Sequence, residues 1–126
     1  MQFILFSVFQ SNLDHETNVR NHLKIKNNLK ELGVNYSDLD GYYNGKGEFS
    51  LMVDAKQEGL VEALCKVYNQ ESYLFVDRKR RAFLTFLEGD QVLKLEGKFK
   101  EVDRSTAILQ ENYTFNPRTE KYYSVL

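Results

Sequence analysis

The pattern of apolar and polar positions predicts that the chain begins with a strand and a long helix. Residues 3–9 form an unbroken apolar run, which is typical of a strand covered on both faces. Between residues 14 and 32, apolar side chains recur at helical spacing, and Gly33 follows where a C-terminal cap belongs. Either Asp14 or Asn12 could cap the start of this helix. We therefore expect a buried strand and then a helix of about five turns.

The middle of the chain predicts two more strands, a second helix and a fourth strand. Residues 34–43 and 48–53 read as strands joined by the hairpin signal Asn44-Gly45-Lys46-Gly47. A capping signal and an apolar stripe predict a helix over 54–69, and residues 73–76 read as a strand. This order is the split β-α-β pattern of ferredoxin-like domains. The fold class expected is α+β, a four-stranded antiparallel sheet with two helices on one face.

The last third of the chain predicts an extension of this core. Residues 82–87 and 92–95 form a further hairpin signal, and a tail with apolar residues ends at 122–125. No linker divides the chain, so residues 1–126 are expected to be one domain, with a core over 1–77 and a C-terminal hairpin and tail over 78–126. Because an uncovered aromatic sheet face would be a large apolar patch, the extension or another subunit should cover it.

Composition and charge exclude several classes of protein. The 126 residues include 17 basic and 18 acidic ones, so no overall field favours nucleic acid or an anionic membrane. The single cysteine, Cys65, cannot form an internal disulfide, and no zinc-ligand or other metal-ligand spacing is present. The apolar start is too short for a signal peptide or a membrane span, so we expect a cytoplasmic protein that binds neither nucleic acid nor membranes.

One pair of candidate catalytic residues flanks the predicted hairpin. If residues 44–47 form a four-residue loop, Tyr43 and Glu48 close it, and directly opposed side chains lie about 5 Å apart on one face. A phenol and a carboxylate would then share a hydrogen bond or a ligand. An ordinary cross-strand polar pair would look the same. If Asn44-Gly45 forms a two-residue turn instead, the pairing changes.

Five polar side chains are expected to converge where the first strand meets the first helix. Polar positions on an apolar helix stripe should face inward, and the free N–H groups of the helix start could bind a carboxylate. In the plainer interpretation, the asparagine caps the helix and the histidine is a core residue. The five residues are Ser7, Ser11, Asn12, Asn18 and His22.

The basic run at 77–81 reads either as an exposed turn or as part of a nucleic-acid surface. RNA-binding domains with this strand order carry stacking aromatics on the third strand, but here Glu48 and Ser50 occupy those positions. Phosphate-binding glycine loops, zinc-protease motifs and nucleophile elbows are absent from the sequence. The turn is therefore favoured.

Several spaced motifs resemble the bacteriophage S-adenosylmethionine (SAM) lyases, formerly called SAM hydrolases. Residues 6–13 resemble the family's Ser-x-Phe-x-Ser-Asn-Leu motif, and Asn18 and His22 continue the similarity. Residues 38–43 resemble Asp-Leu-x-Gly-x-Tyr, with Glu48 following, and residues 97–102 resemble Gly-x-Phe-x-Glu-Val. The loop between Tyr43 and Glu48 is shorter than in the family.

The resemblance implies a trimer similar in architecture to PII signalling proteins, with SAM bound between subunits. It implies that Tyr43 and Glu48 are catalytic and that SAM is the substrate, with no cofactor and no metal. The substrate's carboxylate would attack its own γ-carbon to give methylthioadenosine and homoserine lactone, and loss of host SAM would oppose restriction. The residues implied to bind substrate are Ser7, Phe9, Ser11, Asn12, Asn18 and His22.

Three alternative functions remain open at this point. A hydrolase would use Glu48 as a base for water and would release homoserine. A PII-like trimer could bind SAM or a nucleotide without turnover, and a phage-encoded inhibitor could act by binding a host protein.

Overall fold

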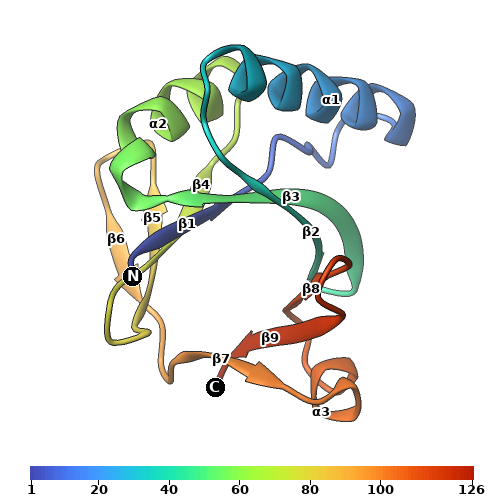
Figure 1. Ribbon diagram of the computed structural model, residues 1–126, viewed down its shortest axis with the longest axis vertical. Coiled ribbons are helices and arrows are strands. Elements are labelled where there is room, and N and C mark those ends of the chain that lie inside the picture. The colour runs from blue at the N-terminus through green and yellow to red at the C-terminus, as the bar shows by residue number, and fades with distance from the viewer.

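The computed structural model describes residues 1–126 and contains nine strands, three α-helices and one 3₁₀ turn. All strands belong to one antiparallel sheet in the order β6-β5-β4-β1-β3-β2-β8-β9-β7 (Figure 1). The elements in chain order are β1 (Phe3–Phe6), α1 (His15–Glu31), β2 (Ser37–Tyr43), β3 (Lys46–Asp54), η1 (Ala55–Gln57), α2 (Glu58–Val67), β4 (Ser72–Val76), β5 (Ala82–Phe86), β6 (Val92–Lys94), β7 (Phe99–Val102), α3 (Arg104–Ile108), β8 (Tyr113–Asn116) and β9 (Lys121–Val125).

Helix α1 begins and ends where the local sequence predicts. The Asp14 carboxylate accepts a hydrogen bond from Thr17 N at 2.7 Å, so Asp14 is the N-terminal cap and Asn12 is not. Its apolar face buries Ile25 and Leu29 against the sheet. Gly33 follows with φ +70°, a left-handed conformation that glycine adopts without steric cost.

Helices α1 and α2 cover one face of the sheet, as expected from the sequence (Figure 1). The core between them is built from alternate residues of β1 and β3 together with the inner face of each helix. Its fully buried members include Ile4, Leu51, Val61 and Cys65. At roughly 1.5–3 kcal/mol for each large apolar side chain, this layer contributes much of the stability of the fold.

The second face of the sheet is covered by the sheet's own C-terminal end. The sheet curls, so that β7 and β9 come to lie opposite β1 (Figure 1), and buried side chains including Phe3, Leu5 and Phe99 pack between them. The Phe99 ring packs edge-on against Phe3 with centroids 5.4 Å apart, and Phe99 N donates to Arg80 O at 2.8 Å. The expectation that the extension covers this face is confirmed.

The structure corrects several predicted element boundaries. The first strand ends at Phe6 rather than residue 9, because an irregular segment buried on both sides has the same apolar pattern as a strand. The second strand begins at Ser37 rather than residue 34. The predicted helix over 54–69 is a 3₁₀ turn followed by α2, and Asp54 accepts from Lys56 N at 2.9 Å instead of from residue 57.

The C-terminal region is more regular than predicted. The hairpin over 82–95 is present as β5 and β6, but the tail adds three strands and a short helix, so the sheet has nine strands rather than four plus a hairpin. The tail joins the sheet through β8, which pairs with the outer edge of β2 at Gly41 and Thr114. That pairing links residues more than 70 positions apart and leaves no local sequence signal.

The basic run at 77–81 forms a tight turn between β4 and β5. Asp77 accepts hydrogen bonds from the backbone N–H groups of Lys79 and Arg81, both at 2.9 Å, and its carboxylate lies 2.7 Å from Arg81 Nε. These bonds lower the pKa of Asp77 against the opposing effect of its own burial. The favoured interpretation as a turn is confirmed.

Candidate active site

The hairpin that carries Tyr43 and Glu48 has a two-residue turn, so the predicted four-residue loop is wrong. Asn44 and Gly45 form the turn with φ values of 52° and 78°, the left-handed geometry that an Asn-Gly pair favours. Tyr43 therefore pairs with Lys46, and Glu48 pairs with Gly41.

Tyr43 and Glu48 nevertheless lie on the same face of the sheet. The register differs from the predicted one by two residues on one strand, and side chains alternate faces with a period of two. The two side chains are therefore diagonal neighbours, with Gly41 directly opposite Glu48. The negative charge of Glu48 acts on the Tyr43 phenol and raises its pKa.

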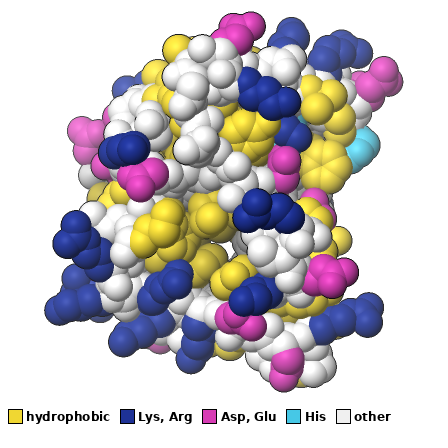
Figure 2. Space-filling view, viewed as in Figure 1, with side chains coloured by type: hydrophobic (Ala, Val, Ile, Leu, Met, Phe, Trp, Pro, Cys, Tyr) yellow, Lys and Arg dark blue, Asp and Glu magenta, His cyan; other side chains and the backbone are white.

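Both residues line a cavity of about 1100 Å³ between the two curled halves of the sheet. Figure 2 shows the surface hollowed near the middle of this face, with hydrophobic side chains around the opening. The wall combines the end of β1, the β2–β3 hairpin, and segments of β4, β7, β8 and β9. The volume is sufficient for a nucleoside-sized ligand.

The charged side chains of the cavity are all acidic. Glu48, Glu71, Glu96 and Glu111 line it, and no lysine, arginine or histidine does. Glu48 is half-buried on the wall, whereas the other three are exposed at the rim. Such a lining favours a cationic ligand.

Desolvation in the cavity wall changes the pKa values of both candidate catalytic groups, although 36% of the Tyr43 surface stays exposed. Desolvation raises the pKa of Glu48 to about 7, opposed by hydrogen bonding from the Ser7 hydroxyl. Desolvation and the charge of Glu48 raise the pKa of Tyr43 to about 12, opposed by a hydrogen bond with Thr114. Glu48 can therefore change charge near neutral pH, while Tyr43 stays a neutral phenol.

Four of the predicted substrate-binding residues line the same cavity: Ser7, Phe9, Ser11 and Asn12. Ser7 Oγ accepts from Phe9 N at 3.1 Å and donates to Phe49 O at 2.8 Å. The same hydroxyl acts on the Glu48 carboxylate and lowers its pKa against the larger effect of burial.

Asn18 and His22 do not line this cavity, and their predicted role in substrate binding stays a prediction. Asn18 accepts from Gln10 N at 2.9 Å and donates to Gln10 O at 3.0 Å, which holds the segment between β1 and α1. His22 packs against Phe49 and lies 3.8 Å from Asp38, and burial lowers its pKa. Inward-facing positions on α1 reach the helix-covered face, which is the opposite side of the sheet.

Three cavity-side residues were not singled out from the sequence. Gln70 Nε2 donates to Ser7 O at 2.8 Å and to Phe9 O at 2.9 Å, and so fixes the end of β1. Thr114 comes to Tyr43 through the pairing of β8 with β2. Ser50 is buried on the same face as Glu48, and its hydroxyl has no hydrogen-bond partner. Only Ser50 could have been found from a local signal, because the period of two along β3 places it on the same face as Glu48.

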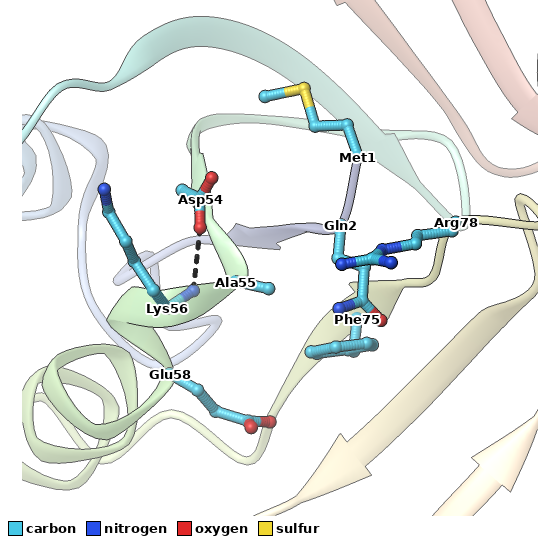
Figure 3. Close-up of a pocket in the computed structure, with 8 residues that line it drawn as sticks. All are labelled: Met1, Gln2, Asp54, Ala55, Lys56, Glu58, Phe75 and Arg78. Carbon is cyan, nitrogen blue, oxygen red and sulfur yellow. Dashed lines mark hydrogen bonds between the residues drawn. The ribbon is translucent and has the colours of Figure 1, made fainter.

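A second pocket, of about 780 Å³, lies at the start of β1 and the end of β3 (Figure 3). Its charged lining is balanced: Asp54 and Glu58 are acidic, and Lys56 and Arg78 are basic. In Figure 3 the Asp54 side chain is turned to the backbone of Lys56, so it caps η1. This pocket lacks the net charge and the paired candidate catalytic groups of the larger cavity.

Two structural features and two sequence comparisons indicate what class of protein this is. No helix has the length and apolar character needed to cross a membrane. No three or more His, Cys, Asp or Glu side chains come together as a possible metal site.

A search of curated proteins found no match. The family model of the S-adenosylmethionine lyase family matches residues 4–126. Because that match spans nearly the whole chain and includes the cavity with Tyr43 and Glu48, the protein belongs to the S-adenosylmethionine lyase family and is an enzyme that cleaves SAM.

Proposed function

We propose that the enzyme converts SAM into 5'-methylthioadenosine and L-homoserine lactone in the cavity that contains Tyr43 and Glu48. A carboxylate oxygen of the substrate forms a bond to its own γ-carbon while the carbon–sulfur bond breaks. The electron pair of that bond goes to sulfur and neutralises the sulfonium. Atoms and charge balance without an added water, proton, metal or cofactor, so SAM is the only small molecule that the reaction requires.

The acidic lining of the cavity is the observation that carries this proposal. SAM presents a sulfonium and an ammonium, and the four glutamates of the cavity attract both. Since no basic side chain lines the cavity, none competes for the substrate's carboxylate by forming an ion pair. That carboxylate then keeps its nucleophilicity, which an intramolecular displacement needs.

Each candidate residue has a specific role in this proposal. Ionised Glu48 holds the cationic side of the substrate, and binding of a cation favours its charged form. Tyr43, neutral at pH 7, donates a hydrogen bond that orients Glu48 and the reacting chain. Ser7, Phe9, Ser11 and Asn12 hold the nucleoside or amino-acid part.

Positioning supplies most of the rate enhancement in this mechanism. Holding oxygen, γ-carbon and sulfur in line removes an entropy barrier, an effect that reaches about 7–11 kcal/mol in well-oriented intramolecular reactions. Excluding water from the cavity also removes solvent that stabilises the separated carboxylate and sulfonium. Both effects need shape and fixed dipoles rather than an additional reagent.

The test is to incubate purified protein with SAM and to identify the products by chromatography and mass spectrometry. Methylthioadenosine with homoserine lactone is expected. Glu48→Gln should lose about a hundredfold or more in kcat/KM, as when a group that stabilises reacting charge is removed. Glu88→Gln makes the same chemical change at an exposed position outside the cavity and should stay within about threefold of wild type.

The same experiment separates the other candidate functions. In heavy-oxygen water, a hydrolase would label homoserine before any lactone forms, whereas a lyase would release unlabelled lactone. Binding of SAM without products would overturn the enzymatic mechanism in favour of a non-catalytic binding protein. An effect on a host protein that survives loss of Glu48 and Tyr43 would favour an inhibitor.

We also propose a homotrimer of ferredoxin-like subunits, similar in architecture to PII proteins, in which a neighbouring subunit covers each active site. Family membership supports this, as does the order β4-β1-β3-β2 with α1 and α2 on one face. Edge strand β6 also exposes Val92 and Leu93. In this proposal a bacteriophage chain acts in the host cytoplasm, and the depletion of SAM opposes restriction.

A further inference from the structure

One row of paired residues crosses three strands beneath the candidate catalytic groups. Glu48 on β3 is paired with Gly41 on β2, and Gly41 is paired in turn with Thr114 on β8. Directly paired residues of antiparallel strands direct their side chains to the same face. The row therefore has a carboxylate at one end, a hydroxyl at the other and no side chain between them.

The Tyr43 ring occupies the space that a side chain at Gly41 would fill. A Cβ atom placed on Gly41 would lie 3.0 Å from Tyr43 Cε2, closer than nine in ten real Cβ contacts. It would also lie 3.5 Å from Glu48 O and from Ser50 Oγ. The ring thus lies back across β2, and its phenol interacts with both Glu48 and Thr114.

The backbone of Gly41 does not require glycine. Four glycines of the chain have positive φ values, and Gly41 is not among them. Alanine could adopt its extended strand conformation, and glycine inside a strand usually weakens it. The reason for glycine at this position is therefore the space above it.

We propose that Gly41 is the positioning residue of the active site: its missing side chain lets the Tyr43 ring lie across β2 and places the phenol between Glu48 and Thr114. This proposal rests on the proposed function for the role of Tyr43 in catalysis. The placement of the ring is a separate property that can be measured without substrate. The ring of Tyr43 can reach over Gly41 because residues two positions apart on a strand share a face of the sheet.

A second glycine in the same hairpin provides a matched control. Gly47 is paired with Tyr42, and a Cβ there would lie 3.3 Å from Tyr42 Cε1. Tyr42 stacks on Tyr113 with centroids 4.6 Å apart, on the sheet face opposite to Tyr43. Gly47→Ala is thus the same substitution, in the same hairpin, against a tyrosine that does not line the cavity.

The experiment compares Gly41→Ala with Gly47→Ala by SAM turnover and by titration of Tyr43. Tyr43 is identified in the ultraviolet or NMR titration by its absence in Tyr43→Phe. We expect Gly41→Ala to lower kcat by about tenfold, because the ring must give way by a few tenths of an ångström and a displacement of about 1 Å can cost about a hundredfold. The pKa of Tyr43 should fall from about 12 toward its ordinary value of 10 as the ring moves outward. Gly47→Ala should change neither quantity.

Two further variants keep the proposal falsifiable. If Gly41→Ala loses stability, the double variant Gly41→Ala/Tyr43→Ala should recover the melting temperature of Tyr43→Ala, because the ring that clashes is gone. In Gly41→Ala/Tyr43→Phe, turnover should not fall below that of Tyr43→Phe alone.

Wild-type turnover together with an unchanged Tyr43 pKa in Gly41→Ala would overturn the proposal. Absence of SAM cleavage in the wild type would overturn the proposed function instead, while the titration would still test the placement of the ring.

Discussion

Replacing Glu48 by glutamine should make the protein more stable at alkaline pH while it removes the negative charge from the cavity. Folding raises the pKa of Glu48 from its ordinary value of 4.5 to about 7, because burial penalises the charged form. At 1.36 kcal/mol for each pH unit, this difference corresponds to roughly 3 kcal/mol. Solvent reaches part of the side chain, so we expect about 2 kcal/mol in practice.

The direction of the pH dependence follows from this pKa. The protonated form of Glu48 is favoured in the folded protein, so the stabilisation is complete below about pH 4.5 and is lost as pH rises through about 7. Glutamine resembles the protonated acid and does not titrate. The difference in unfolding free energy between Glu48→Gln and wild type should therefore grow between pH 4.5 and 7 and reach about 2 kcal/mol at pH 8.

Urea denaturation of both proteins at pH 5 and pH 8 measures this difference directly. Asp14, Asp77 and Asp103 have lowered pKa values and contribute equally to both proteins, so their effects cancel. Glu96→Gln serves as the control, since its side chain is exposed. A Glu48→Gln protein that is no more stable than wild type at pH 8 would refute the argument that Glu48 is held at a cost to stability.

Two further predictions concern buried residues on the cavity side of the sheet. Ser50→Ala should raise the unfolding free energy by about 1 kcal/mol in urea denaturation, because its buried hydroxyl has no partner; a clear loss of stability would contradict this. Phe99→Ala should lower the unfolding free energy by about 3–5 kcal/mol, because the ring packs on Phe3 and stacks on Tyr123 with centroids 5.3 Å apart. A loss below about 1 kcal/mol would show that the closure of the sheet does not depend on this contact.

The sequence predicted the helix-covered half of the molecule because its signals are local. Asp14 and Gly33 marked the ends of α1, and the spacing of Ile25 and Leu29 marked its buried face. Prediction failed where two different structures share the same local pattern. The buried segment after Phe6 is irregular, although its apolar run resembles that of a strand. His22 shows a related limit, since an inward-facing helix position does not reveal which side of the sheet carries the cavity, and this side chain packs against Phe49 rather than lining it.

The sequence by itself determined that Tyr43 and Glu48 share a face, because a shift of two residues preserves the side of every strand residue. It also determined the charges and hydroxyls available there. Only the tertiary structure decided what surrounds this pair. Thr114 reaches Tyr43 through the pairing of β8 with β2, and Phe99 closes the curled sheet against Phe3. Those contacts join residues 70 or more positions apart, and their formation depends on the packing of the whole sheet rather than on any local pattern.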